Sequence, residues 1–331
     1  MNIFQSLKKE NYMRTKKQFI KGICSILSCA VLVFTTVTAA GAVGFEDIYK
    51  IGDVDLDGKI KIDDCTYLQK SLAYCFSLNS NQRVKADVNY DGVVDIVDCT
   101  MLQKIIGGIY TPMTCKKGVD ISSNNGAVNM SKITSAGYDF VMIRCGFGDD
   151  YTSQDDNQFE QNVAKCEAAG IPWGVYIYSY ALNLTEAKSE VAHVKRLLKN
   201  KKPTMPVAFD MEDGDGYKQR HGMPTNSMLV KICETFLTEI EKAGYYPILY
   251  SGLSWMNHVL NNSKILPKYD MWLAQWYTSC DYTGSNLGMW QYGGEVNYIE
   301  SPNISGVGVV DKNYVYKDYP AIIKNGHYNN W

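Results

Sequence analysis

From residue 118 onward the chain alternates between short apolar runs and longer amphipathic stretches. Eight runs have the composition of strands, and they cover residues 118–121, 140–145, 173–180, 206–212, 246–251, 271–276, 289–292 and 307–310. Helical patterns separate several of them, at residues 129–136, 158–169, 185–200 and 225–243. This alternation predicts an α/β fold, an irregular (β/α) TIM-like barrel with weak helices in its last third. We expect the barrel to span residues 118–320, followed by a C-terminal tail at 321–331.

The run at residues 206–212 is apolar and ends in two carboxylates, Asp210 and Glu212. Alternate residues of a strand share a face, so both acids would point away from the large apolar side chains. They would stand roughly 6–7 Å apart at the carboxyl end of the strand, where barrel active sites lie. Two acids that close raise each other's pKa, which favours one protonated general acid. The alternative is an acidic turn leading into residues 213–216.

Two further acids lie beside other predicted strands. Asp120 is in the first run, and Asp311 directly follows the last. Either one alone would be an ordinary cap or turn residue. Together with Asp210 and Glu212, they predict four carboxylates that converge on one mouth of the barrel.

A duplicated segment precedes the barrel. Residues 53–72 and 87–106 are identical at eleven of twenty positions, and each copy opens with an acidic, glycine-containing loop followed by a helical pattern. A 12-residue loop can bind Ca²⁺ through oxygens at positions 1, 3, 5, 7, 9 and 12. We therefore predict a small all-α unit with two structural calcium sites at residues 50–110, a linker at 111–117, and no cofactor for catalysis.

The predicted calcium ligands follow from these loop positions. They are Asp53, Asp55, Asp57, the Lys59 carbonyl and Asp64 in the first loop, and Asp87, Asn89, Asp91, the Val93 carbonyl, Asp95 and Asp98 in the second. Lys61 occupies position 9 of the first loop and cannot be a side-chain ligand, so we expect this site to be the weaker one. The alternative is a pair of acidic turns without metal.

Residues 1–42 have the features of a secretory signal peptide. Basic residues precede an apolar run, and Ala40-Gly41-Ala42 offers a cleavage site. These residues carry six Lys or Arg and one Glu, so their removal from a chain of net charge −2 would leave about −7. We expect a secreted, extracellular or cell-surface protein with no membrane span in its mature form. Its acidic charge gives no reason to expect nucleic acid as a partner.

Cysteine and histidine give no sign of a catalytic or metal site in the barrel. The eight cysteines after residue 42 form no C-x-x-C pair and no zinc spacing, and most are expected as buried thiols. The histidines show no partner pattern, which argues against a Ser/His or metal-dependent hydrolase.

The duplicated segment resembles a dockerin domain, because it has two loop–helix units, Asp at loop position 12 and no helix entering either loop. This resemblance implies calcium-dependent docking onto a cohesin module of a cellulosome-like scaffold protein. The residues that would choose the partner are Ile62, Asp63 and Tyr67 in the first unit, and Ile96, Val97 and Met101 in the second. A calcium-stabilised spacer without a partner is the alternative.

The larger region resembles glycoside hydrolase family 25, the lysozymes of N-acetylmuramidase type. The resemblance rests on an ordered set of motifs. They are Gly118-Val119-Asp120-Ile121-Ser122, Phe140-Val141-Met142-Ile143-Arg144, Asp156-x-x-Phe159-x-x-Asn162, Ala169-Gly170-Ile171-Pro172-Trp173-Gly174-Val175-Tyr176, Phe209-Asp210-Met211-Glu212, Trp272-Leu273-Ala274-Gln275-Trp276, Trp290-Gln291-Tyr292 and Val310-Asp311-Lys312-Asn313. One departure is Trp276, where the family more often has Tyr.

The family resemblance implies hydrolysis of the β-1,4 bond between N-acetylmuramic acid and N-acetylglucosamine in peptidoglycan. Glu212 would be the general acid, Asp210 would orient the 2-acetamido group, and Asp120 and Asp311 would shape the charge of the site. The substrate-binding residues implied are Arg144, Tyr176, Tyr178, Trp272, Gln275 and Trp290. Two alternatives stay open, a catalytically silent glycan-binding module and a hydrolase of chitin-type oligosaccharides. The stereochemical outcome is open as well, because the expected carboxylate spacing lies between the two ranges that would decide it.

Overall fold

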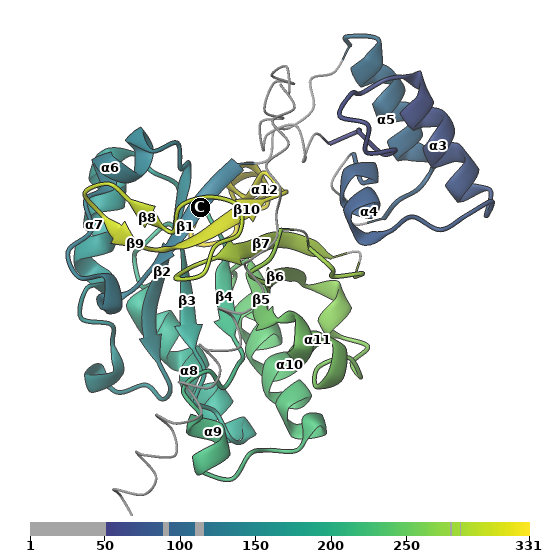
Figure 1. The fold of residues 1–331 in the computed structure, drawn as a ribbon. Helices are drawn as coiled ribbons and strands as arrows, with labels where there is room; N and C mark the ends of the chain where they lie inside the picture. Colours follow the sequence, from purple (N-terminus) through teal and green to yellow (C-terminus); the bar gives the residue numbers. More distant parts are fainter. Residues whose placement is uncertain (1–50, 89–92, 110–115, 279, 285) are drawn as a thin grey trace, which may run out of the picture. The chain divides into compact units, whose positions relative to one another are not determined.

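The computed structural model describes residues 51–88, 93–109, 116–278, 280–284 and 286–331. The predicted signal peptide lies outside the described residues, as do Asn89 and Asp91 of the second loop. In the described part of the chain, no helix is long and apolar enough to cross a membrane. The calcium-loop segment and the barrel are each described by themselves below (Figure 1).

Eight strands close into a barrel, in the order β1-β10-β7-β6-β5-β4-β3-β2. They are β1 (Lys116–Ile121), β2 (Phe140–Phe147), β3 (Trp173–Tyr178), β4 (Val207–Asp210), β5 (Pro247–Gly252), β6 (Asp270–Ala274), β7 (Leu287–Gly293) and β10 (Asp311–Val315). Neighbouring strands from β1 through β2 to β7 are parallel. The α/β barrel is therefore confirmed.

The last barrel strand differs from the prediction in place and direction. Residues 307–310 are not a barrel strand, because β9 (Gly308–Val309) pairs with β8 (Asn303–Ile304) in a separate hairpin. The strand that closes the barrel is β10, which is antiparallel to both β1 and β7. The (β/α) TIM-like barrel that we expected would have only parallel strands, and it is therefore wrong at this one strand. Because β10 runs the other way, its first residue, Asp311, lies at the carboxyl ends of the parallel strands.

Helices cover the outside of the barrel (Figure 1). The four predicted helices are confirmed within a few residues as α6 (Met130–Ser135), α7 (Phe159–Ala169), α8 (Leu184–Leu197) and α10 (Asn226–Lys242). After β5 the helices are short, as expected for the last third. The remaining ones in this part are α9 (Tyr217–Arg220), α11 (Leu253–His258) and α12 (Tyr319–Asn325), with short 3₁₀ turns at Ser123–Asn125, Thr152–Gln154 and Leu266–Lys268.

Strand β4 shows the alternation that its sequence predicts. Its large apolar side chains belong to the core between strands and helices, where the ring of Phe209 stacks on Phe236 of α10 with centroids 4.1 Å apart. Ala208 points the other way, into the barrel interior with Trp272 and Met289. This alternation directs Asp210 inward, because it is two residues beyond Ala208.

The end of the chain, expected as a tail, packs against the barrel. Tyr319 of α12 is fully buried, and its hydroxyl donates to Asp270 Oδ2 at 3.0 Å. Asn329 is also fully buried. Its Nδ2 donates to the carbonyl oxygens of Pro203 and Met205, both at 3.1 Å, and its Oδ1 accepts from Tyr246 N at 2.9 Å. The segments that enter β4 and β5 are thereby tied to the C-terminal segment.

The calcium-loop segment folds around the two predicted helices, α3 (Ile62–Leu72) and α5 (Ile96–Ile106). A short helix between them, α4 (Ser80–Ala86), was not predicted. Equivalent residues of the two repeats fill its core, including Leu68 with Leu102 and Cys65 with Cys99. Across the described residues all seven cysteines are free, and six of them are buried, as expected for thiols.

We predict that Asn329→Ala lowers the free energy of unfolding of the barrel by about 2–3 kcal/mol, because three buried hydrogen bonds are lost. Asn330→Ala is the matched control. Both positions have positive φ, 55° and 67°, so the backbone strain added by Ala is similar. Asn330 Nδ2 donates to the carbonyl oxygens of Lys201 at 2.8 Å and Leu198 at 3.4 Å. Because Asn330 is exposed, water can replace these hydrogen bonds, and its change should cost less than about 1 kcal/mol. Urea unfolding of both variants checks this, and equal losses would contradict it.

Candidate active site

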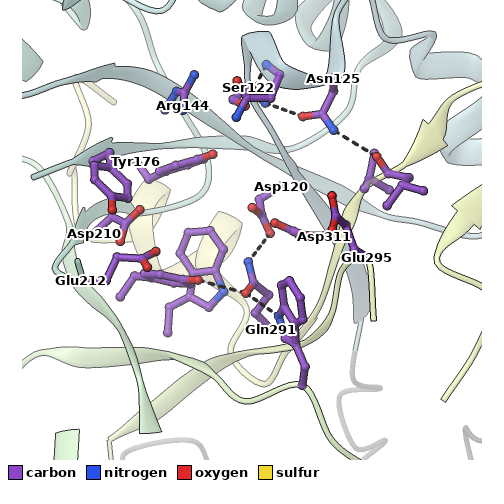
Figure 2. A pocket seen from close by; sticks show the side chains of 17 residues that line it. Asp120, Ser122, Asn125, Arg144, Tyr176, Asp210, Glu212, Gln291, Glu295 and Asp311 are labelled. Atoms are coloured by element: carbon purple, nitrogen blue, oxygen red, sulfur yellow. Dashed lines mark hydrogen bonds between the residues drawn. The ribbon is translucent and has the colours of Figure 1, made fainter. Parts of the chain in front are cut away.

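A cleft of about 470 Å³ opens at the carboxyl ends of the parallel strands. Its side chains come from widely separated parts of the sequence (Figure 2). They are Asp120, Ser122, Asn124, Asn125, Arg144, Tyr176, Tyr178, Asp210, Glu212, Tyr250, Trp272, Trp276, Gln291, Glu295, Val309, Val310 and Asp311. The structure therefore brings together the four carboxylates that the sequence placed beside three separate strands.

Asp120 is held in one orientation by two amide side chains. Gln291 Nε2 donates to Asp120 Oδ2 at 3.0 Å, and Asn313 Nδ2 donates to the same oxygen at 2.8 Å. Burial raises the pKa of Asp120 to about 6, and these two hydrogen bonds act against the rise. Asp120 is therefore ionised near neutral pH, as an almost fully buried anion.

The orientation of both amides is itself fixed. Tyr250 donates its hydroxyl to Gln291 Oε1 at 3.0 Å, and the indole N–H of Trp276 donates to the same oxygen at 2.9 Å. The indole N–H of Trp272 donates to Asn313 Oδ1 at 2.7 Å. Because donors occupy each amide oxygen, the NH₂ groups of both amides must face Asp120.

Asp311 lies opposite Asp120 in the pairing of β10 with β1. Burial raises the pKa of Asp311 to about 8, and the negative charge of Asp120 adds to the rise. Near neutral pH Asp311 is therefore protonated while Asp120 is ionised. The two acids that face each other across one strand pair thus differ in their protonation state.

Asp210 and Glu212 lie beside each other on one side of the cleft (Figure 2). Burial raises the pKa of both, and the charge of Glu212 raises that of Asp210 further. Asp210 Oδ1 is buried and has no hydrogen-bond partner among the described residues. A negative charge on Glu212 therefore makes ionisation of Asp210 less favourable, and the two carboxyls titrate as a coupled pair.

The two members of this pair differ in access to the cleft. Asp210 is only 4% exposed, whereas Glu212 is partly exposed. The turn after Glu212 approaches it closely, since a Cβ on Gly214 would lie 2.6 Å from Glu212 Oε2. Glycine is needed here because a side chain would displace the carboxylate. Glu212 is therefore the member of the pair that is better placed to give a proton to a molecule in the cleft.

Four of the six predicted substrate-binding residues line the cleft, namely Arg144, Tyr176, Tyr178 and Trp272. Tyr176 and Trp272 meet edge to face, with ring centroids 5.9 Å apart. Arg144 is fixed by ion pairing to Asp156, with Nε donating to Oδ2 at 2.8 Å.

The other two predicted residues, Gln275 and Trp290, do not line the cleft. Trp290 is fully buried in the outer core, and its indole N–H donates to the Gln275 carbonyl oxygen at 2.9 Å. The side chain of Gln275 is engaged by Asp281, to which Nε2 donates at 2.6 Å. The inward residue of β7 is Gln291, which sequence reasoning passed over in favour of its aromatic neighbour. Strand alternation could have found it, because Trp290 and Gln291 must face opposite sides.

The first calcium loop has the oxygen donors that its sequence predicts. Carboxylate oxygens of Asp53, Asp55 and Asp57 lie within 4.8 Å of one another. Asp64 Oδ1 accepts from Val54 N at 2.7 Å and from Asp55 N at 3.1 Å, which ties the end of the loop to its beginning. A cluster of carboxylates held by main-chain N–H groups fits a hard cation such as Ca²⁺.

Two lysines already contact the acids of this loop. Lys85 Nζ donates to Asp53 Oδ2 at 2.9 Å, and both side chains are buried. Lys61, at loop position 9, is paired with Asp57. Each ammonium would compete with a bound cation for the same carboxylate, and the weaker affinity of the first site stays a prediction.

The second loop repeats the same framework where the structure describes it. Asp98 Oδ1 accepts from Val88 N at 2.7 Å, and Asp98 Oδ2 accepts from Asp95 N at 2.8 Å. Asp95 caps α5 by accepting from Val97 N at 2.7 Å. The roles of Asp87, Asp95 and Asp98, and of the Lys59 and Val93 carbonyls, stay predictions.

We predict that the barrel loses stability as the pH rises from about 4 to about 8. Folded Asp311 keeps its proton up to about pH 8, whereas an unfolded aspartate loses its proton near the ordinary pKa of 3.8. Folding therefore takes up a proton in this range, and the free energy of unfolding falls as pH rises. Asp311→Asn, which cannot ionise, should flatten this dependence and exceed the parent's stability at pH 8. Urea unfolding across the range, with exposed Glu167→Gln as control, tests this; an unchanged slope would refute it.

Comparisons with known proteins agree with this geometry. Residues 119–300, more than half of the chain, match the model of Glycosyl hydrolases family 25. Residues 51–107 match the Dockerin type I domain. Lysozyme M1 from Streptomyces globisporus is 25% identical over 205 residues, which are 60% of this chain and 66% of the relative.

Solved structures show the same fold. The modular autolysin LytC from Streptococcus pneumoniae superposes with a TM-score of 0.53 at 25% identity, over 60% of this chain and 46% of that chain. A family 25 glycosyl hydrolase from Bacillus anthracis gives 0.52 at 18% identity, over 65% and 93%. The chain thus spans about two thirds of the lysozyme and under half of LytC. The chain belongs to glycosyl hydrolase family 25 and carries a dockerin type I domain before the barrel.

Proposed function

We propose that this protein is a peptidoglycan hydrolase that cleaves the β-1,4 bond between N-acetylmuramic acid and N-acetylglucosamine. One observation carries the proposal, namely that Asp210 and Glu212 both line an open cleft in which burial raises the pKa of each. We propose that the free pair holds one proton. A glycosidase needs one carboxylic acid and one carboxylate beside the bond that it cuts. Family membership and the likeness to a lysozyme support this substrate class.

In the first step Glu212 gives its proton to the glycosidic oxygen, and the bond from that oxygen to the anomeric carbon breaks. The carbonyl oxygen of the substrate's own 2-acetamido group bonds to that carbon, while the negative Asp210 orients and stabilises the acetamido N–H. Water then attacks the anomeric carbon and gives a proton to Glu212, which restores the acetamido group and the pair.

The second pair of acids sets the charge on the opposite wall. The ionised Asp120 favours the positive charge that develops at the anomeric centre. The protonated Asp311 can donate a hydrogen bond to a sugar oxygen. Trp276 also lines the cleft and is 38% exposed, so that its ring offers a stacking face for a sugar.

We predict that Glu212→Gln slows clearing of a cell-wall suspension by about 100-fold or more, because a general acid contributes on that scale. The exposed Glu167→Gln serves as control and should match the parent. If Glu212→Gln cleared walls at the parental rate, the acid assignment would be wrong.

Analysis of the sugar ends separates the remaining alternatives. New reducing ends on N-acetylmuramic acid identify the proposed bond. Wall binding without soluble fragments would identify a silent glycan-binding module. Cleavage of chitin-type oligosaccharides as fast as peptidoglycan would indicate that chitin-type oligosaccharides are the substrate class.

We propose further that the dockerin domain binds two structural Ca²⁺ ions and attaches the enzyme to a cohesin module of a scaffold outside the cell. Supporting this, apolar side chains at loop positions 10 and 11 are exposed where a partner could cover them. Ile62 is 58%, Ile96 is 61% and Val97 is 49% exposed.

Removal of calcium from the full chain should affect the dockerin domain alone. We predict that EDTA abolishes amide-exchange protection in residues 51–109 and leaves protection of the barrel and wall lysis largely intact. Asp53→Ala should lower the calcium stoichiometry measured by calorimetry, with the exposed Asp63→Asn as control. Unchanged protection in EDTA would argue against a structural role for calcium.

A further inference from the structure

One buried cation lies behind the catalytic pair. Lys218, on α9, is fully buried. Its Nζ donates to the Glu212 carbonyl oxygen at 2.8 Å and to the carbonyl oxygen of Ser179. These two carbonyls belong to residues just beyond the ends of β4 and β3. The ammonium therefore ties together the two strand ends that carry Glu212 and Tyr178.

The Lys218 backbone is fixed as well. Its N–H donates to Asp213 Oδ1 at 2.7 Å, so the residue that follows Glu212 caps the short helix that carries the lysine. The main-chain N–H and the side-chain ammonium of Lys218 thus both bond to residues at the start of the segment that runs from Glu212 to Lys218. Movement of the ammonium would be transmitted directly to the Glu212 main chain.

A buried carboxylate on the far side of Ser179 completes this arrangement. Glu190 of α8 is fully buried, and it accepts from Ser179 Oγ at 2.9 Å and from Tyr180 N at 2.7 Å. Burial raises the pKa of Glu190 to about 8, and the charge of Lys218 acts against the rise. Helix α8 is in this way connected through Ser179 to the cation.

A neutral donor could satisfy two carbonyl oxygens without the cost of burying a charge, which is several kcal/mol per ion unless the ion is compensated. The lysine is explained by the acids around it. Its positive charge acts against the burial-driven rise in pKa of both Asp210 and Glu212. The titratable groups that face the ammonium come from four elements and their loops, namely Glu190 from α8, Cys233 from α10, Tyr178 from β3, and Asp210, Glu212, Asp213 and Asp215 from β4 and the loop after it. The catalytic pair also faces Asp120, Tyr178, Asp215, Tyr250 and Asp311.

We propose that Lys218 is a positioning residue that holds the Glu212 main chain at the cleft and keeps one negative charge on the Asp210/Glu212 pair. The inference rests on the proposed hydrolase activity of the same site. Without the cation the pair would take up a second proton over a wider pH range. A doubly protonated pair still has an acid, but it has no carboxylate to stabilise the acetamido group.

The pH dependence of kcat for wall hydrolysis tests whether the positive charge of Lys218 acts on the Asp210/Glu212 pair. In Lys218→Met both limbs of the profile should shift to higher pH, because the charge that lowers both pKa values is gone. Lys218→Arg keeps the charge and should restore the position of the limbs at a reduced kcat. A profile of Lys218→Met that superimposes on the parent's after scaling would overturn the proposal, since a merely structural residue lowers kcat equally at every pH.

Lys317→Met is the matched control. Lys317 is another buried lysine, and its Nζ donates to Asp270 Oδ1 at 2.8 Å. Asp270 begins β6 and Lys317 follows β10, so this pair lies at the end of the barrel away from the cleft. Its loss should lower stability and leave the limbs in place. An equal shift in Lys317→Met would assign the effect to general destabilisation and overturn the proposal.

A second readout does not depend on the substrate. Carboxyl ¹³C NMR, with the Glu212 signal assigned by its loss in Glu212→Gln, should show Glu212 titrating at higher pH in Lys218→Met than in the parent. Lys218→Gln, which keeps N–H donors for both carbonyls, replaces the Met variant if that one does not fold. Unchanged titration would overturn the role of Lys218. Absence of wall cleavage by the parent protein would instead refute the proposed function and leave this measurement standing.

Discussion

Repulsion between buried carboxylates governs the arrangement at this end of the barrel. Four acids line one cleft, and burial raises the pKa of each. On each wall of the cleft, the two acids have different surroundings. Two amide donors stabilise the charge of Asp120 opposite a protonated Asp311. Burial raises the pKa of both Asp210 and Glu212, and we propose that these two acids share one proton. The site therefore has both an acid and a base at one pH, which hydrolysis of a glycosidic bond requires.

The direction of one strand makes this convergence possible. The sequence pattern was sufficient to predict a barrel, four of its helices, and the inward face of β4, because apolar periodicity records burial. It did not predict β10 as an antiparallel strand that starts at Asp311. Strand direction depends on long-range pairing with β1 and β7, which no local pattern contains. The acid itself was found from its place beside an apolar run, although the run belongs to a hairpin.

The same limit explains which site residues were missed. Gln291 and Asn313 stand inside motifs that were recognised, but their role depends on side chains that lie far away in sequence, such as Tyr250 and Trp272. No sequence pattern singled out Lys218, and only the fold shows that it is buried. The calcium loops were easier to predict from the sequence, because all donors of one loop lie within twelve residues and the loop pattern occurs twice in the chain.

The central claim is that Asp210 and Glu212 share one proton when the cleft is free of substrate. A neutron crystal structure of the deuterated protein near neutral pH tests it most directly. The account predicts one deuteron between the two carboxyl groups, one on Asp311 and none on Asp120. Two deuterons on the Asp210/Glu212 pair, or none, would contradict the account, because the pair would then lack either the carboxylate or the acid that the proposed reaction uses.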